Sequence, residues 1–146
     1  MAIKERVALW ADALDSGEFE RGQGALEIIK KDGTKSHCCM GVACRIAMKN
    51  GLELHTETRF ANSVEMTWFS AGSTFNAGSS TFLPQAVRDW YDFDTIDPVV
   101  GYDRYQISVS AANANDDRDW DFHKIAEGLR EMYVRENEEN SNHSDD

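Results

Sequence analysis

The sequence has no long apolar run and no regular cysteine framework. No stretch approaches the ~20 consecutive apolar residues of a membrane span, and residues 1–6 lack the apolar core of a signal peptide. We therefore expect no membrane contact. The three cysteines are an odd number and lie close together, so they form a poor disulfide framework and favour a reducing, cytoplasmic compartment.

Positive charge is also scarce. Fifteen Lys and Arg face 26 Asp and Glu, which gives a formal net charge of −11. Proteins that bind the nucleic-acid backbone need Lys and Arg in excess, so we expect no direct nucleic-acid binding. An acidic balance is compatible with solubility alone, with a basic protein partner, or with imitation of nucleic acid. Solubility alone is the simplest of these explanations.

Apolar residues make up 41% of the 146 residues, enough for the core of one domain. Their helical spacing predicts helices over 3–15, 40–49 and 122–133. Pro84 opens a further short helix, because proline is favoured at a first helical position. The sequence thus predicts about four helices.

Strands are predicted between these helices. Runs over 25–30 and 34–38, joined by Asp32-Gly33, predict a β-hairpin. A strand is also predicted over 64–69, and weaker patterns indicate strands over 79–83 and 106–110.

Together these elements predict an α+β fold. A small antiparallel sheet packs with the helices in a single compact domain over residues 1–135. Residues 136–146 form an acidic tail without an apolar residue, and we expect this tail to be disordered.

Several short motifs occur in a recognisable order. They are ALDSGEF at 13–19, GQGAL at 22–26, CCMGVAC at 38–44, LPQAVRDW at 83–90 and Asn115-Asp116. In this order the chain resembles a group of small tailed-phage and prophage proteins with a CCLGV-A-C core. In this chain Met40 stands where those proteins usually have leucine. The resemblance implies a phage origin and action inside the host cell, and it assigns no catalytic residue.

The cysteine segment admits two functional interpretations. Cys38 or Cys39, between a predicted strand and a helix N-terminus, is placed for thiolate formation, but its base would have to be His55 or His123, and neither lies in a predicted strand. With Cys44 and His37 the segment offers metal ligands, yet structural zinc favours two short hooks from separate segments. Tight packing of buried cysteines is the favoured interpretation, and we expect no metal and no cofactor.

Two acidic runs provide the candidate binding surface. Acids at 116–121 precede the last predicted helix, where capping explains some of them. Acids at 89–97 alternate with aromatic residues, a composition that suits a protein–protein contact, although solvated charge explains such runs more simply. The predicted surface comprises Trp90, Tyr91, Asp92, Asp94, Asp97, Asp116, Asp117 and Asp119.

The functional hypothesis is a phage-encoded, small acidic protein that binds a host protein non-covalently in the cytosol and modulates or inhibits it. One alternative is a hydrolase that uses Cys38 or Cys39. Another is sequestration of a nucleotide immune signal, which needs a concave site with local positive charge. Candidate residues for that site are Arg21, Arg45, Arg59, Trp68, Arg88 and Arg104, with the backbone of Gly22 and Gly24.

Overall fold

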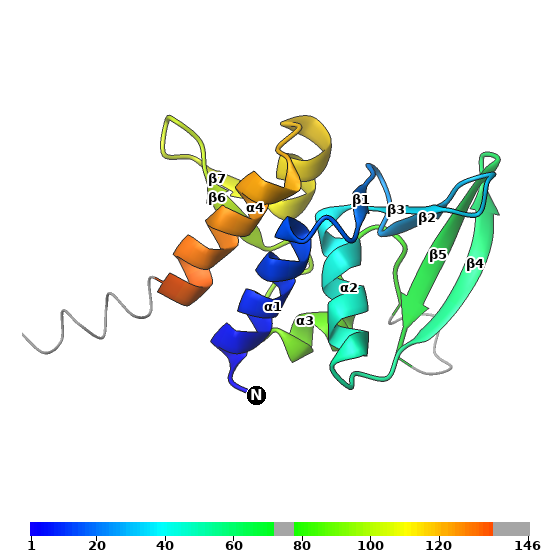
Figure 1. Cartoon of the computed structure of the whole chain (residues 1–146), viewed down its shortest axis with the longest axis horizontal. Helices are drawn as coiled ribbons and strands as arrows, with labels where there is room; N and C mark the ends of the chain where they lie inside the picture. The colour runs from blue at the N-terminus through cyan, green and yellow to red at the C-terminus, as the bar shows by residue number, and fades with distance from the viewer. Residues whose placement is uncertain (72–77, 136–146) are drawn as a thin grey trace, which may run out of the picture.

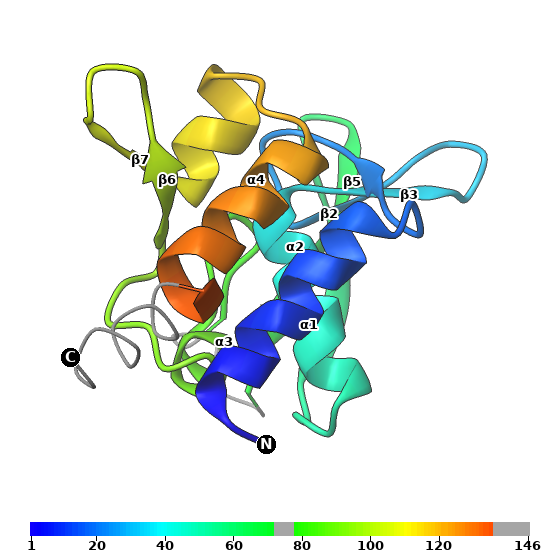
Figure 2. The ribbon, with the colours of Figure 1, turned by 60° about the vertical axis from the view of Figure 1, so that its left-hand side comes forward.

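The computed structural model describes residues 1–71 and 78–135. Helix α1 (Ile3–Asp15) packs against both α2 (Cys39–Lys49) and α4 (Phe122–Leu129), so the first and last helices of the domain lie side by side (Figures 1 and 2). The short helix α3 (Gln85–Trp90) contacts α2. These positions confirm the predicted α+β fold class. Pro84, however, is the residue before α3 and not its first residue.

Helix α2 lies at the centre of the core. Cys39, Ala43 and Ala47 are completely buried on it. The first turn of α2 packs very closely against the backbone of Leu26. A Cβ on Gly41 would lie 1.6 Å from the carbonyl oxygen of Leu26. Glycine is therefore required at this position, because any side chain would force the helix away from its neighbour.

Beside α2 lies a five-stranded mixed sheet with the order β1-β3-β2-β5-β4. The strands are β1 (Glu20–Arg21), β2 (Glu27–Ile29), β3 (Lys35–His37), β4 (His55–Ala61) and β5 (Val64–Ser70). The predicted hairpin is β2–β3, and the predicted strand over 64–69 is β5. The prediction of an antiparallel sheet needs one correction, because β1 pairs with β3 in parallel.

Two strand predictions were inaccurate. Residues 79–83 form no strand; Ser79 alone makes an isolated bridge to Phe69. Strand β4 was not predicted, since all of its residues are exposed and it carries no apolar alternation. The predicted strand over 106–110 is shorter, as β7 (Ser108–Ser110), and pairs with the unpredicted β6 (Val99–Tyr102).

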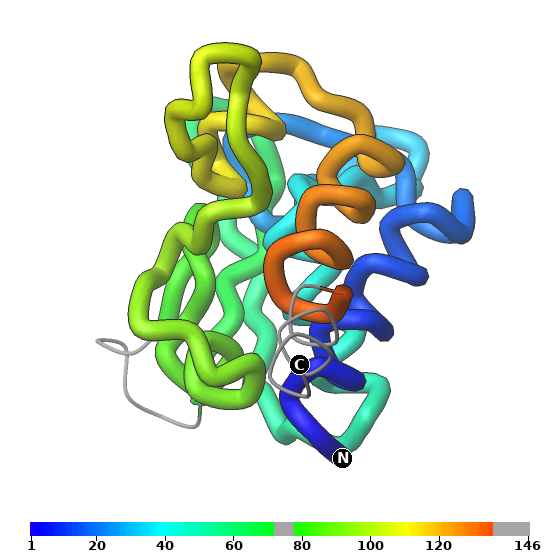
Figure 3. Tube along the Cα trace, turned by 90° about the vertical axis from the view of Figure 1, so that its left-hand side faces the viewer, coloured from blue at the N-terminus to red at the C-terminus, as the bar shows by residue number. Residues whose placement is uncertain are grey.

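Two π-helical segments complete the described chain. Segment η2 (Asn113–Asp117) follows β7, and η3 (Arg130–Arg135) continues α4, which accounts for the length of the predicted last helix. The β6–β7 hairpin and η2 lie at the end of the molecule opposite the N-terminus (Figure 3). The predicted tail 136–146 lies outside the described residues. No helix in the described ranges is long and apolar enough to cross a membrane.

Candidate functional site

The cysteine segment lies where β3 passes into α2, as the sequence predicts, but its thiols are buried. Cys38 immediately precedes α2, while Cys39 and Cys44 are completely buried within it. Burial raises the pKa of the Cys38 thiol to about 12 and raises the pKa of each of the other two well above its ordinary value. Thiols that stay protonated and inaccessible are poor nucleophiles, so packing accounts for these residues.

A histidine beside a thiol could act as its base, but the described histidines are bound or exposed elsewhere. His37 donates a hydrogen bond to Glu27, His123 is hydrogen bonded to Asp15, and His55 lies on the exposed strand β4. In residues 1–71 and 78–135, therefore, no hydrogen bond joins a cysteine sulfur to a histidine. Among these described residues the hydrolase alternative has no assembled pair of cysteine and histidine.

A buried carboxylate ties the sheet to α2. Glu27 on β2 is 1% exposed and accepts two hydrogen bonds of 2.7 Å from Arg45, one of 2.6 Å from Thr67 and one of 2.8 Å from His37. Burial alone would raise the pKa of Glu27, but these hydrogen bonds outweigh it and hold the pKa well below its usual range. Because its partners come from β3, β5 and α2, this cluster stabilises the fold.

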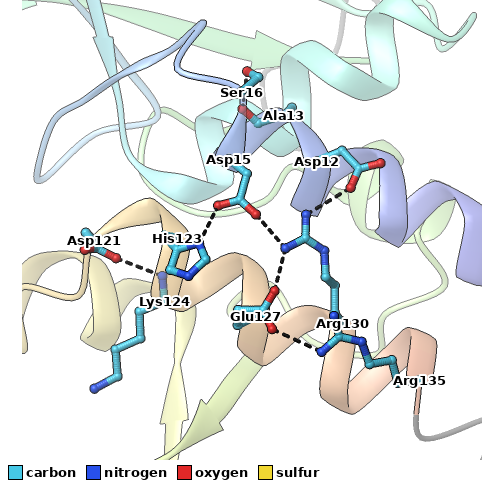
Figure 4. A network of polar contacts seen from close by, with 10 residues as sticks. All are labelled: Asp12, Ala13, Asp15, Ser16, Asp121, His123, Lys124, Glu127, Arg130 and Arg135. Atoms are coloured by element: carbon cyan, nitrogen blue, oxygen red, sulfur yellow. Dashed lines mark hydrogen bonds and ion pairs between the residues drawn. The ribbon is translucent and has the colours of Figure 1, made fainter.

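A second charged network joins the two ends of the domain (Figure 4). Arg130, the first residue of η3, donates to Asp12 and Asp15 of α1 at 2.9 and 2.5 Å, and to Glu127 of α4 at 2.7 Å. Asp15 also lies 2.9 Å from Nδ1 of His123. The hydrogen bond from His123 to Asp15 raises the pKa of His123. All these groups are paired with one another, so the network joins α1 to α4.

The aromatic residues of the predicted binding surface do not face solvent together. Tyr91 is buried, and its hydroxyl donates a 2.8 Å hydrogen bond to the carbonyl oxygen of Ala43. Trp90 is half-buried, and the guanidinium of Arg6 covers its ring at 4.5 Å from the centroid. Tyr91 therefore belongs to the core, which corrects its assignment to a surface.

The acids that follow α3 divide into free and structural groups. Asp92 and Asp94 are exposed. Asp97 accepts a 2.8 Å hydrogen bond from the backbone N–H of Ala112, so it anchors the chain after β7. Only Asp92 and Asp94 of this run are exposed members of the predicted surface.

The second acidic run is engaged with the chain before β2. Asp119 accepts a 2.6 Å hydrogen bond from Arg21, and Asp116 accepts one of 3.2 Å from the N–H of Gly24. Asp117 is exposed. Segment η2 and α3 lie at opposite ends of the molecule (Figures 2 and 3), so the eight predicted residues do not form one surface.

Capping of the last helix is confirmed for Asp121, which accepts a hydrogen bond from the backbone N–H of Lys124.

An apolar hollow of about 220 Å³ lies beside α3. We use this name for the surface formed by Phe82, Leu83, Pro84 and Ile96. The backbone N–H of Leu83 donates to the carbonyl oxygen of Ile96, which brings the two segments together. Ile96 is 46% exposed and lies two residues after the exposed Asp94 in the sequence, so this segment presents both an apolar and an acidic side chain to solvent.

A second hollow, of about 380 Å³, is locally basic although the chain is acidic. The basic hollow comprises Arg104, Tyr105, Arg118, Trp120 and Lys124, with Tyr102 and Asp103 completing its lining. Tyr105 is 68% exposed, and the Arg104 guanidinium lies 4.9 Å from the centroid of its ring. The Lys124 ammonium lies 4.4 Å from the Trp120 ring.

The cations of the basic hollow differ in their pairing. Arg118 forms a 3.1 Å ion pair with Asp103, whose carboxylate also accepts the N–H groups of Tyr105 and Ile107 and so shapes the β6–β7 turn. Within the described ranges, neither Arg104 nor Lys124 forms an ion pair. Two cations without a carboxylate partner and an exposed aromatic ring therefore share one concave surface.

Sequence reasoning named Arg104 but missed the rest of the basic hollow. Its residues come from the β6–β7 turn, from the segment that leads into α4 and from the first turn of α4, and no local spacing connects the turn with the other two. Arg45 and Arg59, which were also named, are paired instead with Glu27 and Glu57. A pattern of cations next to aromatic residues, as in Arg104-Tyr105, was the available signal.

Comparison with known proteins identifies a family but no function. A family model described as a domain of unknown function (DUF8296) matches residues 2–134. No curated protein and no solved structure matches the chain. Among the side chains of residues 1–71 and 78–135, no group of three or more His, Cys, Asp or Glu is arranged to hold a metal ion.

Proposed function

This chain belongs to the DUF8296 family, a domain of unknown function, and we propose that it acts by non-covalent binding, with the basic hollow as a site for a nucleotide. One observation carries this proposal: Arg104 and Lys124 line the same aromatic-lined hollow in a chain of net charge −11. Neither cation has an ion-pair partner among the described residues. Most other cations in the described segments are paired with carboxylates, whereas Arg104 and Lys124 lie against the rings of Tyr105 and Trp120 and keep an uncompensated charge.

Each part of a nucleotide has a counterpart in the hollow. The exposed Tyr105 ring offers a face on which a base can stack, and stacking on an aromatic side chain contributes about 1–3 kcal/mol per base. Arg104 and Lys124 supply the charge for a phosphate, and an arginine can donate two parallel hydrogen bonds to it. The volume of about 380 Å³ falls within the usual range of small-molecule sites.

Thermal unfolding in the presence of nucleotides tests this site. With ATP, GMP or a cyclic dinucleotide at 100 times its Kd, the expected stabilisation is about 2.7 kcal/mol. Arg104→Ala should weaken binding by roughly 10- to 100-fold, since a hydrogen bond to a charged group contributes about 1.5–3 kcal/mol. Absence of any shift with millimolar nucleotide contradicts the proposal.

Arg88→Ala is the control. Arg88 on α3 is also partly exposed, but it lies outside the basic hollow and forms a 3.9 Å ion pair with Asp89. Its replacement removes the same charge from the chain and should leave nucleotide binding unchanged. An equal loss in Arg104→Ala and Arg88→Ala would show that only net charge matters and that the basic hollow is not the site.

A second candidate, a host protein partner, rests on the apolar hollow. There Ile96 and Phe82 are exposed, and the exposed acids Asp92 and Asp94 precede Ile96 in the sequence, a combination that fits a partner segment with apolar and basic residues. The resemblance to tailed-phage and prophage proteins supports a phage origin, a site of action in the host cytosol and a host protein as this partner.

Capture from host lysate with matched variants tests the protein partner. A protein retained by the wild type should be lost with Ile96→Ser combined with Asp92→Asn and Asp94→Asn. Asp117→Asn, which changes an exposed acid of η2, outside the apolar hollow, should retain it. Equal capture by both variants would remove the apolar hollow from consideration.

A further inference from the structure

The outer edge of the five-stranded sheet is open and regular. Strand β4 is the last strand in the order, and in the described part of the chain no strand pairs with its outer edge. Its pairing with β5 runs without interruption from His55↔Ser70 to Ala61↔Val64, and the strand contains no proline. Proteins commonly block such edges with prolines, bulges or very short strands, because an open edge recruits another strand. None of these three devices occurs on β4, and its charged side chains, which are another means of blocking an edge, are of opposite sign at Glu57 and Arg59.

The hairpin fixes which backbone groups face this edge. Asn62 and Ser63, both with positive φ, form a two-residue turn, so Ala61 and Val64 flank it as a hydrogen-bonded pair. Bonded and non-bonded pairs alternate along an antiparallel ladder. Consequently Thr56, Thr58 and Phe60 direct their N–H and C=O groups away from β5 and toward the open edge.

The side chains of β4 make this edge complementary to itself. In an antiparallel pair of two β4 strands centred on Thr58, Glu57 of each copy lies opposite Arg59 of the other. All seven residues of the strand then pair, and Thr56 lies opposite Phe60. Registers centred on Glu57 or on Arg59 pair fewer residues and place like charges directly opposite each other, which is unfavourable.

We propose that a second copy of this chain binds along β4, in antiparallel register about Thr58, and joins two five-stranded sheets into one. The outward-facing residues Thr56, Thr58 and Phe60 pair with Phe60, Thr58 and Thr56 of the second copy, and each pair exchanges two main-chain hydrogen bonds. Phe60, which is 74% exposed in the single chain, packs beside Thr56 of the second copy. Charge complementarity at Glu57 and Arg59 selects this occupant, because both partners of the ion pair come from the same strand.

Sedimentation velocity over a range of protein concentrations tests the dimer. The wild type should change from monomer to dimer as its concentration rises at about 0.15 M salt. Glu57→Arg alone and Arg59→Glu alone each put like charges across the interface and should weaken dimerisation by tenfold or more. The double exchange, Glu57→Arg with Arg59→Glu, restores opposite charges and should restore the dimer.

Two further variants make the outcome decisive. Thr58→Pro removes an N–H that faces the open edge and not β5, so it should abolish the dimer while circular dichroism shows an intact fold. Glu53→Arg changes the charge by the same amount at an exposed position outside β4 and should leave the dimer unchanged. A wild type that remains monomeric at millimolar concentration, or a double exchange that fails to restore a dimer, overturns the proposal.

Discussion

Replacement of Glu27 by glutamine tests whether the buried carboxylate holds the sheet to α2. The variant keeps the side-chain shape, but it removes the charge and turns an NH₂ group toward donors of Arg45, His37 or Thr67. Breaking a buried ion pair costs about 3–5 kcal/mol. Because the Arg45 side chain is 27% exposed and keeps some hydration, we expect a loss near the lower limit, about 3 kcal/mol.

Urea and thermal unfolding, followed by tryptophan fluorescence, measure this loss. For a chain of this size, about 3 kcal/mol corresponds to a decrease in Tm of roughly 6–12 °C. Glu53→Gln, at an exposed position, is the control and should leave the free energy of unfolding unchanged within about 0.5 kcal/mol. A Glu27→Gln variant that unfolds with the control would refute a stabilising role for the cluster.

The pH dependence gives an independent check on the same residue. The folded pKa of Glu27 lies below its ordinary value of 4.5, so the ionised carboxylate stabilises the folded chain above pH 4.5. This contribution is lost progressively as the pH falls from that value toward the folded pKa. The difference in stability between the wild type and Glu27→Gln should therefore be largest near pH 7 and shrink in acid. A difference that grows in acid contradicts the assignment.

Three other predictions concern the core and the α1–α4 network. All three thiols should resist iodoacetamide at pH 7 until denaturant unfolds the chain, because burial raises their pKa values; rapid labelling of Cys38 in the native protein, read by mass spectrometry, would reopen the hydrolase alternative. Asp15→Asn should lower the pKa of His123 in an NMR titration, since Asp15 raises that pKa. In the wild type the pair of His123 and Asp15 stabilises the fold below pH 6.5, and this contribution is lost as the pH rises through the raised pKa of His123. Gly41→Ala should lower the free energy of unfolding by about 3 kcal/mol or more, because the new Cβ meets the backbone of Leu26; thermal unfolding at the wild-type Tm would contradict this close approach.

The sequence predicts those elements whose signal is local. Helix α1 shows both a regular apolar spacing and a stop at Ser16-Gly17, and the Asp32-Gly33 turn lies between two strand-like runs. Strand β4 has no comparable signal. Its seven residues are exposed on both faces, so the alternation that identifies a half-buried strand is missing, and only its pairing with β5 defines it.

Functional surfaces are harder to predict, because they depend on contacts between distant segments. Tyr91 lies among acids in the sequence and so has the composition of a surface site, yet its hydroxyl reaches Ala43 in the core. Conversely, Arg104 and Lys124 are 20 positions apart and share a hollow only because the β6–β7 turn lies against the first turn of α4 and the segment before it. Neither arrangement follows from periodicity or spacing.

The contrast between a net charge of −11 and a local basic hollow bears on the kind of ligand proposed here. At about 0.15 M salt, charges separated by more than ~8 Å are largely screened, so a small anion inside the hollow interacts mainly with Arg104 and Lys124. A longer strand would extend beyond the hollow and approach exposed acids such as Asp117 and Asp119, the sequence neighbours of Arg118. Each additional phosphate there adds repulsion instead of an ion pair. The charge distribution therefore favours a mononucleotide or dinucleotide over RNA or DNA, and affinity should fall as the number of linked nucleotides increases.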